Sequence, residues 1–409
     1  MILDNFRDNN LINLVDREGM RQQDTLSLVA SESLAPKFIQ QLAGGILTNR
    51  TFEGYPGKRY YAGGEFFDQI ETLAIDRAKD LFGAEHANVQ PHCGANTNLA
   101  VYHGVLKPGD TILAMDLSAG GHLSHGHPMN ISSSIYKVIH YGVSEANATI
   151  DYDSVRDLAK AYSPRLIIGG TSSYPRLVDW EKLSEIAHES GSLLLADVAH
   201  TAGLIAAGVV PSPVPYSDFV TFSCYKTLPG PRGGCILCRG DFASIIDKAV
   251  FPGIQGSLNA PLIAAKAACF ELAKTQIFKD LAGQIIRNSK VLAATLQNKG
   301  FKIVTGGTDT HRILVDLSEI NISGKDAEKL LEKSGVNVNR NVIPFEKKPP
   351  WIASGIRLGT TVVTLRGFKE ENMEEIGDII AAIIKGGREQ GKQEGLKNKV
   401  RDLCKAFPI

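Results

Sequence analysis

The sequence has no surplus of charge of either sign. Its 409 residues include 44 lysines and arginines and 44 aspartates and glutamates, so the formal net charge is zero. Nucleic acids and anionic membrane surfaces attract proteins with a positive surplus, so neither partner is expected. No apolar run approaches the ~18 residues of a membrane-spanning helix. The opening MILDNFRDNN lacks the basic and apolar regions of a secretion signal.

Paired cysteine motifs are also scarce. The six cysteines are scattered and mostly lie in apolar runs, which suits reduced, buried thiols in a cytoplasmic protein. Cys235 and Cys238 form one C-x-x-C, but no second pair completes a zinc site. We therefore expect GGCILC to be a buried strand and not a metal or redox site.

The chain does contain a regular alternation of short apolar runs and amphipathic segments between about residues 80 and 240. The segment DWEKLSEIAHESG has helical spacing and ends in a glycine. Strands that are apolar throughout and linked by helices predict an α/β fold with a mainly parallel sheet buried on both faces. Ligands bind such sheets at the carboxyl ends of the strands. The predicted strands are DTILAM, YKVIHY, RLIIGG, SLLLADV, DFVTFS and GCILC.

A chain of this length is too long for one ordinary core, and its pattern changes after about residue 280. Helices near 280–299, 325–334 and 369–386, with short strands between them, predict a smaller α+β domain. The spacing near 6–22 predicts an amphipathic helix, and the polar KGGREQGKQEGLKNKV predicts a solvated loop before a last helix. We expect three regions: an N-terminal helical arm (1–30), a large domain (31–280) and a small C-terminal domain (281–409).

Two buried strands each deliver a polar side chain at their end. LLLADVAH carries Asp197, with His200 three residues later, and DFVTFSCYK leads to Lys226. Lys226 comes 29 residues after Asp197, a gap that fits one connection within the same sheet, so both side chains can face one crevice. An aspartate for a ring nitrogen and a lysine for an aldehyde are what pyridoxal phosphate requires. The plainer alternatives are a helix N-terminus or an arginine beside Asp197, and a surface charge at a strand end for Lys226.

Three further segments fit the same cofactor and an amino-acid substrate. Cys93, Gly94 and Ala95 open a helix whose free N–H groups would hold a phosphate. In AGGHLSHGHPMN a neutral His122 would stack on a pyridine ring. Metal binding is the alternative there, although no acidic or cysteine ligand is nearby in the sequence. Arg357 in SGIRLGT would bind a carboxylate, with an internal salt bridge as the alternative.

Together these segments resemble the serine hydroxymethyltransferases, pyridoxal-phosphate enzymes with the aspartate-aminotransferase-like fold. The resemblance runs from LVASES near residue 28 to RGFKEENMEEI near residue 376. It implies a fold type I enzyme with a seven-stranded sheet, active as a homodimer or tetramer with shared sites and with tetrahydrofolate as co-substrate. Its densest parts are EGYPGKRYYAGG, LFGAEHANVQPH, GGHLSHG, DVAHTAGLIAAG, KTLPGPRGG, FPGIQG, IAAKA and SGIRLGT.

The resemblance also implies roles for single residues. Lys226 would bind the cofactor aldehyde, Asp197 would pair with the ring nitrogen, and His122 would stack on the ring. Glu53 and Tyr61 would act in catalysis from the partner subunit. Further cofactor contacts would be made by Cys93, Gly94, Ala95, Ser172, His200, Ser223, Tyr225, Gly256 and the partner's Tyr55. Substrate would be bound by Ser31, Glu53, Tyr61 and Arg357, and folate by Leu117, Gly121, Leu123 and Asn341.

The sequence departs from the family pattern close to the cofactor. Tyr225 stands where the family usually has histidine, Thr51 where it has tyrosine, and Cys93 where it has serine. Losing two hydroxyl donors would weaken phosphate binding, because a hydrogen bond to a charged group contributes about 1.5–3 kcal/mol. Further differences fall at Ala95, Pro229 and residues 257–261.

These departures leave three interpretations open. The first is the family reaction, in which serine and glycine are interconverted. The second is a related cleavage of a Cα–Cβ bond, as in a 2-methylserine hydroxymethyltransferase, a threonine-type aldolase or a transaldolase. The third is a non-catalytic homologue, against which the retention of Lys226, Asp197, Glu53 and Arg357 argues.

Overall fold

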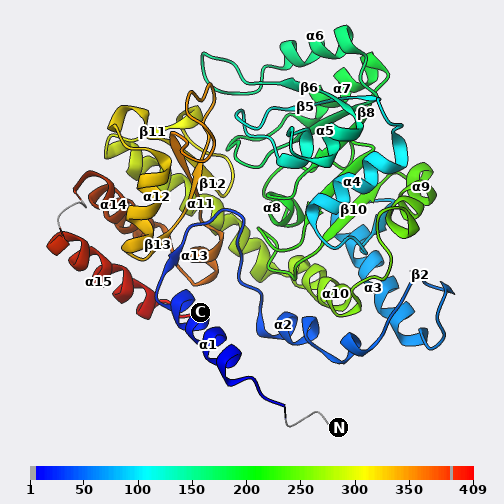
Figure 1. Ribbon diagram of the computed structural model, residues 1–409, viewed down its shortest axis with the longest axis horizontal. Coiled ribbons are helices and arrows are strands. Elements are labelled where there is room, and N and C mark those ends of the chain that lie inside the picture. The colour runs from blue at the N-terminus through cyan, green and yellow to red at the C-terminus, as the bar shows by residue number, and fades with distance from the viewer. Residues whose placement is uncertain (1–5, 387–389) are drawn as a thin grey trace.

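The computed structural model describes residues 6–386 and 390–409 (Figure 1). A seven-stranded sheet with the order β4-β10-β9-β8-β7-β5-β6 forms its centre. Only β10 runs against the others, so the predicted mainly parallel sheet is confirmed. The strands are His86–Asn88 (β4), Thr111–Met115 (β5), Lys137–Tyr141 (β6), Leu166–Gly170 (β7), Leu193–Asp197 (β8), Phe219–Ser223 (β9) and Gly234–Cys238 (β10).

Successive side chains of these strands enter two apolar cores, one on each face of the sheet. Along β5, Ile112 and Ala114 lie in one core, and Leu113 and Met115 lie in the other. Burial on both faces explains why the inner strands are largely apolar, whereas the edge strand β6 exposes Lys137 and His140. The first face is covered by α4 (Gly94–Val105) and α9 (Ala243–Lys248). The second is covered by α3 (Glu65–Phe82), α6 (Tyr152–Tyr162), α7 (Trp180–Ser190), α8 (Ala202–Ala206) and α10 (Ala260–Lys274).

Local signals place the ends of these helices. The side chain of Asp179 caps α7 by accepting a hydrogen bond from the backbone N–H of Lys182 at 3.1 Å. Gly191 ends the helix with φ at 66°, a left-handed conformation that favours glycine. The helix predicted for DWEKLSEIAHESG is therefore confirmed, with its glycine stop. The shorter elements of this part are α2 (Lys37–Ala43), β2 (Gly54–Tyr55), β3 (Lys58–Arg59) and α5 (Ile131–Ile135).

A second, smaller unit lies beside the large sheet (Figure 1). Its four-stranded antiparallel sheet has the order β11-β12-β15-β14 and a separate apolar core. Helix α11 joins the two units, because Phe278 lies in the large core and Leu292 in the small one. The predicted boundary at residue 280 falls inside this helix. The elements are α11 (Gln276–Asn298), β11 (Lys302–Ile303), β12 (Arg312–Asp316), α12 (Gly324–Lys333), β14 (Asn339–Asn341), β15 (Gly355–Gly359), α13 (Thr361–Leu365) and α14 (Glu370–Gly386).

The segment at residues 23–27 and the C-terminal segment lie together on the small unit. Helix α1 (Asn9–Gln23) has no buried residue, and β1 (Leu26–Ser27) then pairs in parallel with β13 (Val336–Asn337). Helix α15 (Gln390–Ala406) lies near α1 in Figure 1. No helix in the described ranges is long and apolar enough to cross a membrane.

Residues 387–389 of the predicted solvated loop lie outside the described ranges. From Gln390 onward the predicted loop is wrong, because α15 begins there. Val400 and Cys404 are fully buried in the small core, and Leu396, Leu403 and Phe407 pack against it. Their spacing follows one face of a helix. The overall polarity of the segment concealed this stripe.

Candidate active site

A cavity of about 130 Å³, here called the lysine cavity, lies at the carboxyl ends of β8 and β9. This is the edge at which parallel sheets bind ligands. All but two of its lining residues, Thr171 and Ala199, are among those predicted for the cofactor. The lining is formed by Cys93, Gly94, Ala95, His122, Thr171, Ser172, Asp197, Ala199, His200, Ser223, Tyr225 and Lys226.

Asp197 is a buried carboxylate with three hydrogen bonds. Its Oδ2 accepts from Nδ2 of Asn98 at 2.8 Å and is 2.9 Å from Nε2 of His125. Its Oδ1 accepts from the backbone N–H of Ala199 at 3.0 Å. Burial acts to raise the pKa of Asp197, but hydrogen bonds and the nearby imidazoles outweigh it and hold that pKa well below its usual range. An ionised carboxylate out of water suits a protonated ring nitrogen.

The partners of Asp197 differ from the plainer alternatives considered from the sequence. His125 and Asn98 hold it, rather than an arginine or a helix N-terminus. Sequence reasoning gave His125 no role. The repeated histidine of GGHLSHG is the one signal that could have found it, because the short helix η2 (Leu123–His125) sets His122 and His125 on the same loop.

Asp197 supplies the acidic group that the sequence did not indicate near the histidines. Single ligand atoms of His122, His125 and Asp197 lie within 4.8 Å of one another, so an acidic ligand is near the histidines after all. Two of these groups already bond each other, and Nδ1 of His122 lies 2.8 Å from the hydroxyl of Ser124. The absence of a metal from the functional site stays a prediction.

His122 lines the lysine cavity as a neutral imidazole. Burial is the main cause that lowers the pKa of His122 to about 4. The ring is therefore uncharged at neutral pH, which is the state required for stacking on a protonated pyridine.

Lys226 is buried, with 8% of its surface exposed, so the alternative of a surface charge is wrong. Its ammonium has no hydrogen bond or ion pair to the residues that the structure describes. Burial lowers the pKa of Lys226 to about 8, although Asp197 opposes the shift. More of this amine is therefore uncharged and nucleophilic near neutral pH than for an exposed lysine.

The start of α4 offers backbone N–H donors for an anion at the same cavity as Asp197. No side chain caps this helix, because Sγ of Cys93 donates to Oδ1 of Asn96 at 2.7 Å instead. A Cβ on Gly94 would overlap Oγ of Ser223, so the helix start rests directly on the end of β9. Uncapped N–H groups, an ionised carboxylate and a free amine around one cavity fit a phosphorylated pyridine aldehyde.

Arg357 reaches the edge of the cavity from β15. Its Nη1 donates to the carbonyl oxygen and hydroxyl of Ser172 at 2.9 and 3.1 Å, and its Nε donates to Oδ1 of Asn339 at 3.0 Å. Burial lowers the pKa of Arg357 to about 10, so it remains a cation. Within the described ranges no carboxylate lies at ion-pair distance, so the internal salt bridge is wrong. Ser31 is half-buried and outside the cavity lining.

The residues predicted to act from a partner subunit lie outside the lysine cavity of their own chain. Tyr61 is 47% exposed, and Glu53 lies beside the exposed Gly256. Tyr55 differs, because its hydroxyl donates to the carbonyl oxygen of Asp247 at 2.6 Å and accepts from Nδ2 of Asn88 at 2.9 Å. Its cofactor role stays a prediction, and it would require Tyr55 to leave both partners.

The four residues predicted for folate do not form a cavity of their own among those described. Leu123 is 49% exposed, and Leu117 is partly buried. The amide of Asn341 on β14 donates to the carbonyl oxygen of Val342 at 2.7 Å. Packing explains the glycine at position 121, because a Cβ there would overlap the carbonyl oxygen of Met115. Folate binding by these residues stays a prediction.

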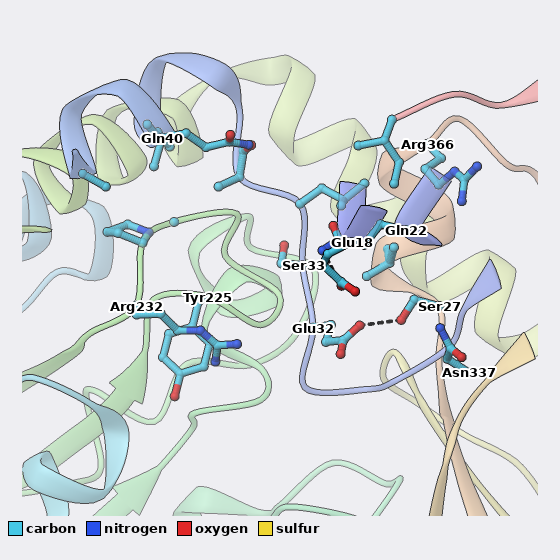
Figure 2. Close-up of a pocket in the computed structure, with 18 of the residues that line it drawn as sticks. Glu18, Gln22, Ser27, Glu32, Ser33, Gln40, Tyr225, Arg232, Asn337 and Arg366 are labelled. Atoms are coloured by element: carbon cyan, nitrogen blue, oxygen red, sulfur yellow. Dashed lines mark hydrogen bonds between the residues drawn. The ribbon is translucent and has the colours of Figure 1, made fainter. Parts of the chain in front are cut away.

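Tyr225 lines both the lysine cavity and a larger cleft of about 440 Å³. Figure 2 shows this cleft, with Tyr225 and Arg232 together at one edge and Arg366 at the other. The Arg232 guanidinium carbon lies 4.2 Å from the centre of the Tyr225 ring. The tyrosine is thus held by packing against Arg232.

Comparison with protein families matches residues 5–380 to the family described as serine hydroxymethyltransferase. The matched span contains every residue that lines the lysine cavity and ends within α14. It therefore includes the large unit, the joining helix α11 and most of the small unit, but not the end of α14 or α15.

The lowered pKa of Lys226 predicts the pH dependence of its reactivity. In the protein without cofactor, modification of Lys226 by an amine-directed acylating reagent should rise with pH through a midpoint near 8. Exposed lysines should instead follow their usual pKa of about 10.4. Asp197→Asn should move the midpoint of Lys226 lower, because it removes the charge that favours the ammonium. Peptide mass spectrometry measures both, and a Lys226 midpoint near that of exposed lysines would contradict the account.

Proposed function

The chain belongs to the serine hydroxymethyltransferase family, and we propose that it interconverts serine and glycine with pyridoxal phosphate as cofactor and tetrahydrofolate as one-carbon carrier. The observation that carries the proposal is the lysine cavity, in which the free amine of Lys226, the ionised Asp197 and the start of α4 face one another. When bound, the cofactor supplies an electron sink for the pair released at the substrate Cα.

Each group of the cavity then has a defined task. Lys226 would hold the cofactor through its aldehyde. Asp197 would hold the protonated ring nitrogen, and the first N–H groups of α4 would hold the phosphate. The neutral His122 covers one ring face without adding charge.

Arg357 is suited to hold the substrate carboxylate. Asn339 and Ser172 fix its guanidinium at the cavity edge, and no described carboxylate neutralises it. A planar guanidinium binds a carboxylate through two parallel hydrogen bonds. The amino acid would thereby be oriented with its Cα beside Lys226.

The remaining groups are proposed to come from a second copy of the chain. An apolar hollow of about 810 Å³, formed by α2, α3, α10 and the segment between α2 and β2, leaves Phe38 63% and Ile46 80% exposed. Monomeric proteins rarely leave such surface open. Glu53 and Tyr61 lie a short way along the chain from this surface. A partner packed on the surface would then have its own lysine cavity near these two side chains. Glu53 would then move the proton of the substrate hydroxymethyl group.

The proposed reaction is tested by incubating the cofactor-loaded protein with L-serine, with and without tetrahydrofolate, and measuring glycine. Fast glycine formation that depends on folate is the expected result. Little glycine under either condition, with the visible absorbance of the lysine-bound cofactor intact, would contradict it. That outcome would favour 2-methylserine or a threonine-type substrate at the same site, consistent with the changes at Tyr225 and Thr51.

Shared sites predict complementation between two inactive variants. Lys226→Ala and Glu53→Gln homodimers should each be inactive. A hybrid dimer, purified through two different tags, should have one intact site and recover about half of the wild-type activity. If the hybrid is as inactive as its parents, both groups act within one chain and the partner contribution is wrong.

A further inference from the structure

Lys266 on α10 is a buried charge that the proposed reaction does not use. Only 2% of its surface is exposed, and its neighbours along the helix, including Ala267 and Phe270, belong to the large apolar core. Its Nζ donates to the carbonyl oxygens of Val89 at 2.6 Å, Pro91 at 3.0 Å and Gly234 at 2.9 Å. No carboxylate of the described residues pairs with it.

The number of partners matches the charged form of the side chain. An ammonium group has three N–H donors and no acceptor, so three carbonyl oxygens use all of them. A neutral amine would have two donors and would turn its lone pair toward the third oxygen. Burial acts against the charge and lowers the pKa of Lys266. The hydrogen bonds to the three carbonyl oxygens therefore offset the cost of burying the ammonium.

The effect of this ammonium falls on the carbonyl groups that surround it. Methionine at this position would take the donor away from three buried carbonyl oxygens, and leaving one such group unsatisfied costs about 1–3 kcal/mol. The charge therefore acts on the segments whose carbonyl oxygens it binds.

Those segments lead directly to the phosphate end of the lysine cavity. Val89 and Pro91 lie in the short link between the end of β4 and Cys93, which precedes the first turn of α4. The backbone N–H of Gly234 donates to the carbonyl oxygen of Pro91 at 3.0 Å, so β10 holds the same link. A Cβ on Gly234 would lie 2.7 Å from the carbonyl oxygen of Cys93, and one on Gly233 would overlap the Lys266 side chain.

We propose that Lys266 is the positioning residue for the cofactor phosphate: it fixes the link at 89–93 so that the uncapped N–H groups of Gly94 and Ala95 face the lysine cavity. This inference rests on the proposed function only in that the cavity takes up pyridoxal phosphate. It requires neither serine nor folate.

Pyridoxal, which has the same ring and aldehyde but no phosphate, separates positioning from general stability. Full-length protein freed of cofactor is titrated with pyridoxal phosphate and with pyridoxal, and the visible absorbance of the lysine-bound form gives each affinity. Lys266→Met should weaken pyridoxal phosphate binding by about 10- to 100-fold, the loss of one charge-assisted hydrogen bond or more. Pyridoxal binding should change by less than about threefold, because it makes no phosphate contact.

Two variants serve as controls. Lys274→Met removes a partly exposed lysine of the same helix, which pairs with Asp80 at 2.5 Å, and should leave both affinities unchanged. Lys266→Gln keeps two N–H donors without the charge and should give an intermediate loss for pyridoxal phosphate alone. It also serves if the methionine variant fails to fold.

Equal weakening of both ligands, or of neither, would overturn the role of Lys266. If the wild-type protein takes up neither ligand, the proposed function itself fails and this inference fails with it. Absence of serine turnover with normal uptake of both ligands would affect only the proposed reaction.

Discussion

The arrangement of the site depends on one buried carboxylate, that of Asp197, at the end of β8. Asp197 stays ionised because Asn98, His125 and a backbone N–H bind it. The amide oxygen of Asn98 accepts from the hydroxyl of Thr221 at 2.7 Å, which fixes α4 against β9. The same amide donates to Ser124 at 2.9 Å and so connects the loop that carries His122. The start of α4 and the imidazole of His122, to which we assign phosphate binding and ring stacking, are therefore connected to the same carboxylate.

The charges around the cavity are unbalanced in a way that matches the proposed ligands. Lys226, Arg357 and the buried Arg312 are cations near a single carboxylate. Burial keeps His200 neutral by lowering its pKa well below the usual range. A phosphate at α4 and a substrate carboxylate at Arg357 would supply the missing negative charge. The buried ammonium of Lys266 acts at the same end of the cavity as the proposed phosphate site. It orders the backbone that leads into α4 and does not contact the ligand.

The sequence predicts those parts of the molecule whose signals are local. The apolar strands, the ends of α7, and the placement of Asp197 and Lys226 at one sheet edge all follow from periodicity and strand ends. His125 was missed because its partner is 72 residues away, and Lys266 because its carbonyl partners lie 32 to 177 residues away. A lone lysine in an alanine-rich helix carries no local sign of such contacts. The start of α15 was missed because a narrow apolar stripe is diluted by many charges.

The central claim, that an ionised Asp197 anchors the cofactor ring, is tested most directly by nitrogen NMR of bound pyridoxal phosphate labelled with ¹⁵N in the ring. Asp218→Asn, at the opposite end of the sheet where the Asp218 side chain accepts from the backbone N–H of Leu194 at 2.8 Å, is the matched control. The account predicts a protonated ring nitrogen at alkaline pH in the wild type and in Asp218→Asn, and an unprotonated one in Asp197→Asn. An unprotonated nitrogen in the wild type, or a signal unchanged by Asp197→Asn, would contradict it.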